Sequence, residues 1–215
     1  MYDHSPRRTM MVDTQVRPND VTKFPIIEAM LSVPRENFVP DGCQDAAYVG
    51  ENLDIGPGRV MFEPRTLAKL LDALDPQPGA KVLILGAALG YTAALLARMS
   101  GPVVAVEEDA ALAALAQDRL QGLANVTVRT GPVAAGAAMD GPFDRILIEG
   151  GVEDLPADLL AQLKEGGRIG AVFMQGALGQ ARIGHRIDQK VSWRFSFNAA
   201  APVMAGFAKA QEFTF

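Results

Sequence analysis

The segment KVLILGAALGY, residues 81–91, constrains the fold of this chain more than any other part of it. It begins with a short apolar run that predicts a buried strand, continues through a turn of small residues, and enters a helix at Tyr91. Such a turn lets a ligand approach the backbone and meet the N–H groups at the start of the helix. The sequence therefore predicts a nucleotide-type ligand near Gly86 and Gly90.

Short apolar segments alternate with helical patterns after residue 81. Strands are expected at 82–85, 103–106, 126–128, 143–148 and 169–173, and helices at 91–99, 109–120 and 157–163. This alternation is typical of right-handed crossovers in an α/β fold with a mostly parallel sheet. Two further strand-like runs, 190–197 and 208–215, have no helix between them and predict an antiparallel edge. The segment RIGHRI, residues 182–187, is interpreted as an exposed basic face.

The first third of the chain has a different pattern. Apolar spacing predicts amphipathic helices over 19–31 and 63–74, while LDIGPG, residues 53–58, is expected to be an irregular loop. We expect residues 1–75 to form an N-terminal helical arm and a substrate-side segment. Residues 76–215 are expected to form the α/β domain, and the two parts to pack as one compact domain.

Composition narrows the function classes. The 215-residue chain is 49% hydrophobic and carries a net charge of −5 without a lysine or arginine run, which disfavours nucleic-acid binding. Because the chain has only two histidines and one cysteine, no structural metal site is expected. The longest apolar run of the chain is shorter than the roughly 20 residues that span a bilayer, and the N-terminus does not resemble a secretory signal. We therefore expect a cytoplasmic protein without membrane contact.

An acidic residue, Glu107, ends the strand that follows the turn. A carboxylate at this place can accept hydrogen bonds from both hydroxyl groups of a ribose. An alternative is that Gly86 only makes a turn and that Glu107, Glu108 and Asp109 only cap a helix. The pattern G-x-G-x-x-G is incomplete, which disfavours NAD or FAD.

Six segments together resemble one known family, that of the protein-L-isoaspartate O-methyltransferases, which use S-adenosylmethionine (SAM). The resemblance extends from about residue 11 to residue 170. The segments are VPRENFVP (33–40), AYVGENLDIGPGRVMFEP (47–64), PGAKVLILGAALGYTAALLA (78–97), VVAVEEDAALAALAQDRL (103–120), NVTVRTGPVAAG (125–136) and GPFDRILIEGGVEDLPADLLAQLKEGGRI (141–169).

The resemblance implies a Rossmann-like class I methyltransferase fold with helices on both faces of the sheet. It implies SAM as cofactor and a protein or peptide substrate that is methylated on a carboxylate of an altered residue. Glu107 would hold the ribose, and residues 131–133 would lie near the adenine. The full set of expected cofactor-binding residues is Gly86, Ala87, Ala88, Gly90, Tyr91, Glu107, Glu108, Gly131, Pro132 and Val133.

The chain departs from the family pattern at several positions. Ile84 replaces an acid in the first motif, Ala88 replaces a glycine, and Pro132 replaces an aspartate. On the substrate side the family's T-I-S reads Val60–Met61–Phe62 here. The candidates for substrate contact are Arg59, Val60, Phe62 and Glu63, with no catalytic residue assigned. These departures leave a second hypothesis, a family member without catalysis that acts as a binding or regulatory module.

Overall fold

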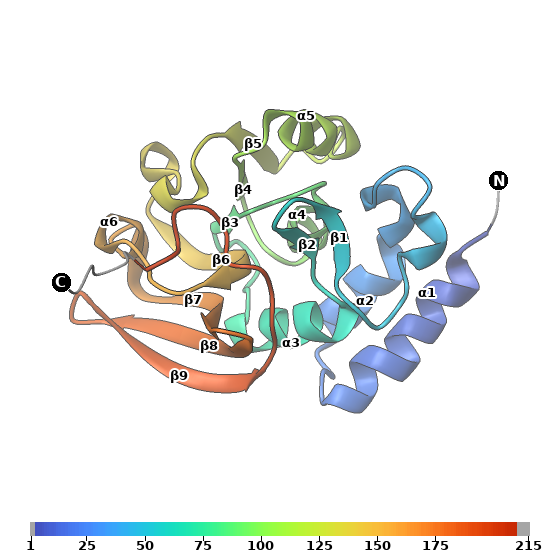
Figure 1. The fold of residues 1–215 in the computed structure, drawn as a ribbon, viewed down its shortest axis with the longest axis horizontal. Coiled ribbons are helices and arrows are strands. Elements are labelled where there is room, and N and C mark those ends of the chain that lie inside the picture. Colours follow the sequence, from blue (N-terminus) through green and yellow to red (C-terminus); the bar gives the residue numbers. More distant parts are fainter. Residues whose placement is uncertain (1–2, 210–215) are drawn as a thin grey trace.

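The computed structural model describes residues 3–209, which contain a seven-stranded sheet in the order β5-β4-β3-β6-β7-β8-β9. Its parallel strands are β3 (Val82–Leu85), β4 (Val103–Glu107), β5 (Val126–Thr130), β6 (Phe143–Val152) and β7 (Leu163–Gln175). At one end of the sheet, β8 (Leu178–Ile187) and the edge strand β9 (Lys190–Asn198) pair antiparallel. The predicted α/β fold with a mostly parallel sheet and an antiparallel C-terminal edge is confirmed (Figure 1).

Helices cover both faces of this sheet. They are α1 (Ser5–Met11), α2 (Phe24–Ser32), α3 (Pro64–Leu74), α4 (Tyr91–Met99), α5 (Ala110–Arg119) and α6 (Ala157–Leu160). One apolar cluster joins α2, α3 and α4 to the side chains of Val82 and Ile84. A second cluster, on the opposite face, joins α6 to Leu83 and Leu85. Because β3 alternates between the two clusters and is completely buried, it is the centre of the fold.

The N-terminal part differs from the sequence prediction in where its helices lie. The helix expected over 19–31 begins only at Phe24, because Asp20 adopts a left-handed conformation that interrupts it. Residues before it are helical as well, in α1, a π-helical turn at Val12–Val16 and a 3₁₀ turn at Arg17–Asn19. Met11, Val12 and Val16 belong to the same apolar cluster as the central strand.

Three strands were missed in the sequence. The expected loop 53–58 is part of a hairpin in which β1 (Leu53–Gly56) pairs with β2 (Arg59–Met61), separate from the main sheet. The expected basic face 182–187 lies within β8, which pairs on both sides. The predicted strand at 190–197 is present as β9, whereas 208–215 lies mostly outside the described residues. The helix expected over 157–163 is shorter, ending at Leu160.

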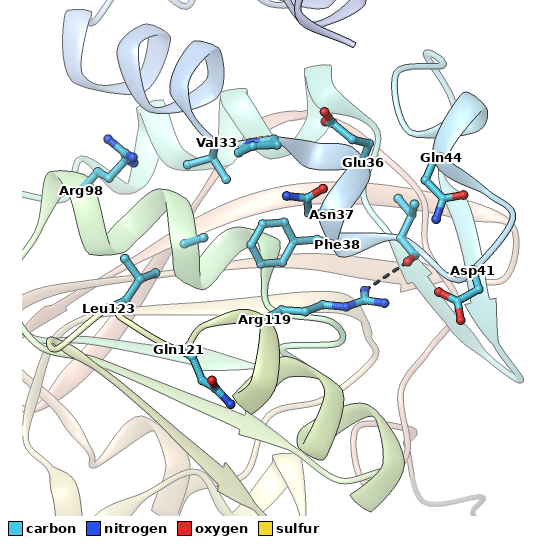
Figure 2. Close-up of a pocket in the computed structure, with 13 residues that line it drawn as sticks. Val33, Glu36, Asn37, Phe38, Asp41, Gln44, Arg98, Arg119, Gln121 and Leu123 are labelled. Atoms are coloured by element: carbon cyan, nitrogen blue, oxygen red, sulfur yellow. Dashed lines mark hydrogen bonds between the residues drawn. The ribbon is translucent and has the colours of Figure 1, made fainter. Parts of the chain in front are cut away.

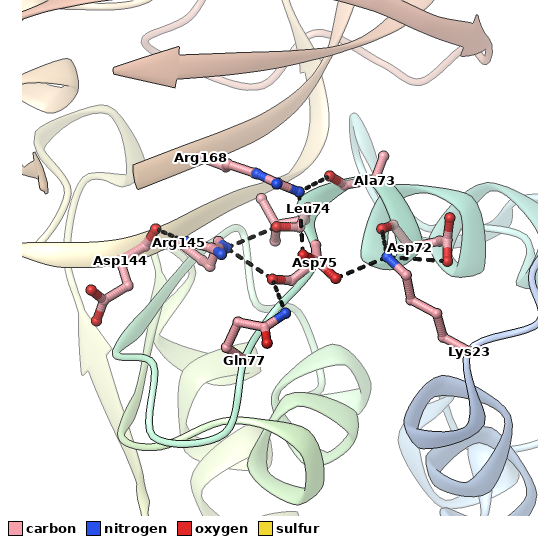
Figure 3. Close-up of polar contacts among 9 residues, drawn as sticks. All are labelled: Lys23, Asp72, Ala73, Leu74, Asp75, Gln77, Asp144, Arg145 and Arg168. Atoms are coloured by element: carbon pink, nitrogen blue, oxygen red, sulfur yellow. Dashed lines mark hydrogen bonds and ion pairs between the residues drawn. The ribbon is translucent and has the colours of Figure 1, made fainter. Parts of the chain in front are cut away.

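Two arginines of the sheet hold the C-terminal end of α3 (Figure 3). Arg145 Nε donates to the carbonyls of Leu74 at 2.8 Å and Asp75 at 3.1 Å, and Arg168 Nη1 donates to the carbonyl of Ala73 at 3.2 Å. The last carbonyls of a helix have no partner within it, so these contacts satisfy them and bind α3 to β6 and β7.

Within residues 3–209, no helix combines the length and the apolar character needed to cross a membrane. The same residues contain no group of three or more His, Cys, Asp or Glu side chains arranged to hold a metal ion.

Candidate functional site

The turn after β3 lies where the strand order reverses. The chain passes outward from β3 through β4 to β5 and then returns to β6 on the other side of β3. In open α/β sheets, this crevice beyond the carboxyl ends of the strands is where ligands bind. Gly86, Ala88 and Gly90 all have positive φ, at 80°, 52° and 95°, so the turn is tightly wound.

Glu107 ends β4 beside this turn and is 0% exposed. Its Oε2 accepts from the backbone N–H of Ala88 at 2.7 Å, and its Oε1 accepts from that of Asp109 at 3.1 Å. The structure thus brings together Glu107 and the turn, as the sequence suggested for a ribose-binding acid. Asp109, by contrast, caps α5, since its Oδ1 accepts from the N–H groups of Ala111 and Leu112.

Arg59, at the start of β2, binds the same carboxylate. Its Nη1 lies 2.6 Å from Oε1 of Glu107 and its Nη2 lies 2.7 Å from Oε2, a two-pronged ion pair. Burial acts to lower the pKa of Arg59, but the hydrogen bonds and charge of Glu107 outweigh it and raise the pKa. Arg59 was a candidate for substrate contact, and the structure places its guanidinium on the carboxylate of Glu107.

The remaining residues expected to bind the cofactor lie around the Arg59–Glu107 pair, some lining a cavity and others buried in the turn. Glu108 and Val133 line a cavity of about 320 Å³ beside Arg59. The N–H of Gly131 donates to the backbone carbonyl of Glu107 at 3.0 Å, and Pro132 precedes the 3₁₀ turn Val133–Ala135. Ala87 is buried in the turn.

Gly90 and Tyr91 have packing roles here. A Cβ on Gly90 would lie 2.8 Å from Cδ1 of Leu120, so glycine permits that close approach. The Tyr91 side chain is buried under the turn, with its ring centroid 4.8 Å from the Arg35 guanidinium and 5.8 Å from the Phe38 ring.

A buried polar cluster lies behind the turn, and sequence reasoning singled out only one of its members, Tyr91. It contains Arg35, Tyr91, Thr92 and Glu149, and among the described residues each has one buried polar atom without a hydrogen-bond partner. Burial raises the pKa of Glu149 to about 7, while Thr92, Arg35 and Arg59 act in the opposite direction without cancelling it. An acid directly after the buried run ILI was the available signal for Glu149.

The other substrate-side candidates do not approach Glu107 in the same way. Phe62 is fully buried, and its carbonyl accepts from Arg35 Nη2 at 2.7 Å. Glu63 precedes α3, and its Oε1 accepts from the Thr66 hydroxyl at 2.7 Å. Val60 is half-buried in the hairpin.

A larger cavity of about 540 Å³ lies between residues 33–44, α4 and α5 (Figure 2). Arg119 crosses it, and its Nη1 donates to the Val39 carbonyl at 3.1 Å. None of the expected cofactor-binding residues lines this cavity.

The contacts of Glu107 decide how well these residues fit SAM. A carboxylate offers about four acceptor positions, and the four contacts from Arg59, Ala88 and Asp109 use them. A Cβ on Gly86 would lie 2.8 Å from the Met204 sulfur and 3.3 Å from Arg59 Nη2, so other parts of the chain occupy the space over the turn. In this arrangement the site has room on the expected adenine side and no free acceptor for the ribose.

Comparison with known proteins identifies relatives over most of the chain. The profile of one protein family, described as Protein-L-isoaspartate(D-aspartate) O-methyltransferase (PCMT), matches residues 7–190. A protein-L-isoaspartate O-methyltransferase of Methylorubrum extorquens is 41% identical over 168 residues, which cover 78% of this chain and 74% of the relative. The enzyme of the same name from Syntrophus aciditrophicus is 37% identical over 189 residues, covering 85% and 87%.

Solved structures agree on the fold. A structure named protein-L-isoaspartate O-methyltransferase superposes with a TM-score of 0.82 at 23% identity, covering 93% of this chain and 66% of that one. A second, described as a putative enzyme of this name from Plasmodium falciparum in complex with S-adenosyl-L-homocysteine, gives a TM-score of 0.76 at 15% identity and covers 94% and 98%. These likenesses establish a Rossmann-like methyltransferase fold for this chain.

Proposed function

Because the chain belongs to the protein-L-isoaspartate(D-aspartate) O-methyltransferase family, we propose that it is a SAM-dependent methyltransferase acting on a carboxylate of an altered protein residue. The observation that carries this proposal is the match over residues 7–190, which includes the turn at Gly86 and the buried acid Glu107. The curated relatives cited above are named as enzymes, and they give no support to a non-catalytic alternative.

SAM supplies an activated methyl group, so the protein's own task is to bind it, align the acceptor oxygen and exclude water. Glu107 is the residue that would hold the ribose once its hydrogen bonds to Arg59 are broken. Ile84 cannot bind the ammonium group of the cofactor. Glu149 lies two residues after Leu147, which pairs with Ile84, and brings a buried carboxylate to the same crevice.

The substrate class is tested by transfer of a labelled methyl group from SAM to a peptide. We expect label in a peptide with one isoaspartyl residue and none in the same peptide with ordinary aspartate. The control is a protein variant, Glu107→Ala, whose transfer should fall at least tenfold because a charged hydrogen-bond acceptor is lost. Equal labelling of both peptides, or label in neither by a protein that binds SAM, would contradict the substrate assignment.

A further inference from the structure

Two segments of the chain cover the cofactor turn from outside. One is the tip of the β1–β2 hairpin, which brings Arg59 to Glu107. The other, residues 199–209, follows β9 and returns to the end of β6, where Gly151 N–H donates to the Pro202 carbonyl at 2.8 Å and Met204 N–H donates to the Gly151 carbonyl at 3.0 Å. Figure 1 shows this second segment, in red, running past β6. The turn is therefore enclosed by the chain itself.

The Arg59–Glu107 contact has the properties of a strong interaction. It is two-pronged, with distances of 2.6 and 2.7 Å, and the side chain of Arg59 is only 15% exposed while that of Glu107 is 0% exposed. Charged, two-pronged hydrogen bonds out of water are stronger and more directional than neutral ones. Arg59 thus binds in the plane of the carboxylate, on the oxygens that a ribose would need.

The hairpin that carries Arg59 is anchored in the core at its base rather than at its tip. At its base Leu53 pairs with Met61, which is buried in the core, whereas Arg59 pairs with Gly56 next to the turn residues Pro57 and Gly58. The hairpin has no strand pairing with the main sheet among the described residues. A two-stranded hairpin of this size is marginally stable by itself, so its tip depends on the contact of Arg59.

We propose that Arg59 is an internal competitor of the cofactor: its guanidinium binds Glu107 where the ribose hydroxyls bind, and SAM enters only when the hairpin tip withdraws. This inference rests on the proposed use of SAM and adds the residue that sets its affinity. A ligand that binds only an open state has its apparent affinity reduced by the populated fraction of that state. If the tip is withdrawn in a tenth of the molecules or fewer, removing Arg59 strengthens binding by about tenfold or more.

The test is a calorimetric titration with SAM of the wild-type chain, Arg59→Ala and Arg59→Gln. Arg59→Ala should bind SAM at least about tenfold more tightly than the wild type, and Arg59→Gln should lie between them. The matched control is Lys164→Ala, which removes a two-pronged ion pair with Asp144, at 2.9 Å on both oxygens, near the opposite ends of the strands. Its affinity for SAM should equal that of the wild type.

A second measurement does not depend on a variant that folds. Hydrogen exchange of the wild-type chain should rise at residues 53–61 when SAM is added, because the tip withdraws. Equal SAM affinities of the wild type and both Arg59 variants, or unchanged exchange at 53–61 with SAM bound, would overturn the proposal. A methyl-transfer assay distinguishes the competition by Arg59 from the proposed function. If Arg59→Ala binds SAM more tightly but transfers no methyl group to an isoaspartyl peptide, the role of Arg59 is supported and the proposed activity is contradicted. Absence of SAM binding by every folded variant contradicts both.

Discussion

Ala88 has a left-handed conformation, with a φ of 52°, in the turn after β3. An alanine in this region costs about 1–2 kcal/mol because its Cβ approaches the backbone. The conformation is held by the N–H of Ala88, which donates to Glu107 at 2.7 Å. The strain is thus stored at the contact between the turn and its acid.

Replacing Ala88 by glycine should leave the free energy of unfolding unchanged or raise it by up to about 1 kcal/mol. The relief of strain is partly offset by the greater freedom of glycine in the unfolded chain. Chemical denaturation measures the change, and Ala114→Gly, at an exposed position in the middle of α5, is the control, expected to lose about 1 kcal/mol. A loss of similar size in both variants would contradict the strain at Ala88.

Glu149 makes stability depend on pH. Its side chain is 2% exposed, and burial raises its pKa from 4.5 to about 7. The folded state therefore holds the proton more tightly than the unfolded state, and stability falls as pH rises from about 4.5 to 7 and then levels off. The two pKa values differ enough to change the free energy of unfolding by about 3 kcal/mol across this window.

Glu149→Gln should remove this dependence, since glutamine does not titrate. Urea denaturation of both proteins between pH 5 and 8 should show the free energy of unfolding of the variant increasing relative to that of the wild type as pH rises. A constant difference across the range would mean that Glu149 does not titrate in the window.

At the scale of single elements, the C-terminus of α3 depends on side chains from another part of the chain. Arg145 binds two of its last carbonyls, and burial, followed by the charge of Arg168, lowers the pKa of Arg145. Arg145→Met should lower the free energy of unfolding by about 1–3 kcal/mol, because buried carbonyls lose their donor. Thermal or urea denaturation measures this.

The comparison for that variant is Arg129→Ala. Arg129 forms an ion pair with Asp140 at 3.0 Å on the surface, and an exposed pair of this kind contributes about 0–1 kcal/mol. A cost for Arg145→Met no larger than that of Arg129→Ala would show that the carbonyl contacts do not stabilise α3.

Elements with clear periodicity could be predicted, whereas β8, which has two glycines inside it, could not. The buried strands β3 and β4 and the helix α4 follow the apolar pattern closely. In β8 the pattern is hidden by Gly184, which is needed because a Cβ there would lie 2.5 Å from Val191 and 3.2 Å from Trp193. A glycine that admits a neighbouring side chain looks, in the sequence alone, like a break in the strand.

At the scale of the whole molecule, the sequence predicted the mostly parallel sheet and the turn after β3, but not what covers that turn. Arg59 and Glu107 are 48 residues apart, and Met204 reaches Gly150 from the far end of the described chain. No local pattern connects such positions, because their contact results from where loops meet after the sheet has formed. The motif positions therefore located the turn, whereas the residues that cover it can be identified only from the structure.

One consequence of the Arg59–Glu107 pair concerns time rather than affinity. If SAM waits for the hairpin tip to withdraw, the observed rate of association at high SAM concentration levels off at a ceiling equal to the opening rate. Stopped-flow mixing would show this ceiling for the wild type and a linear rise for Arg59→Ala. A protein of this kind responds to a sudden supply of SAM at a pace set by its own hairpin.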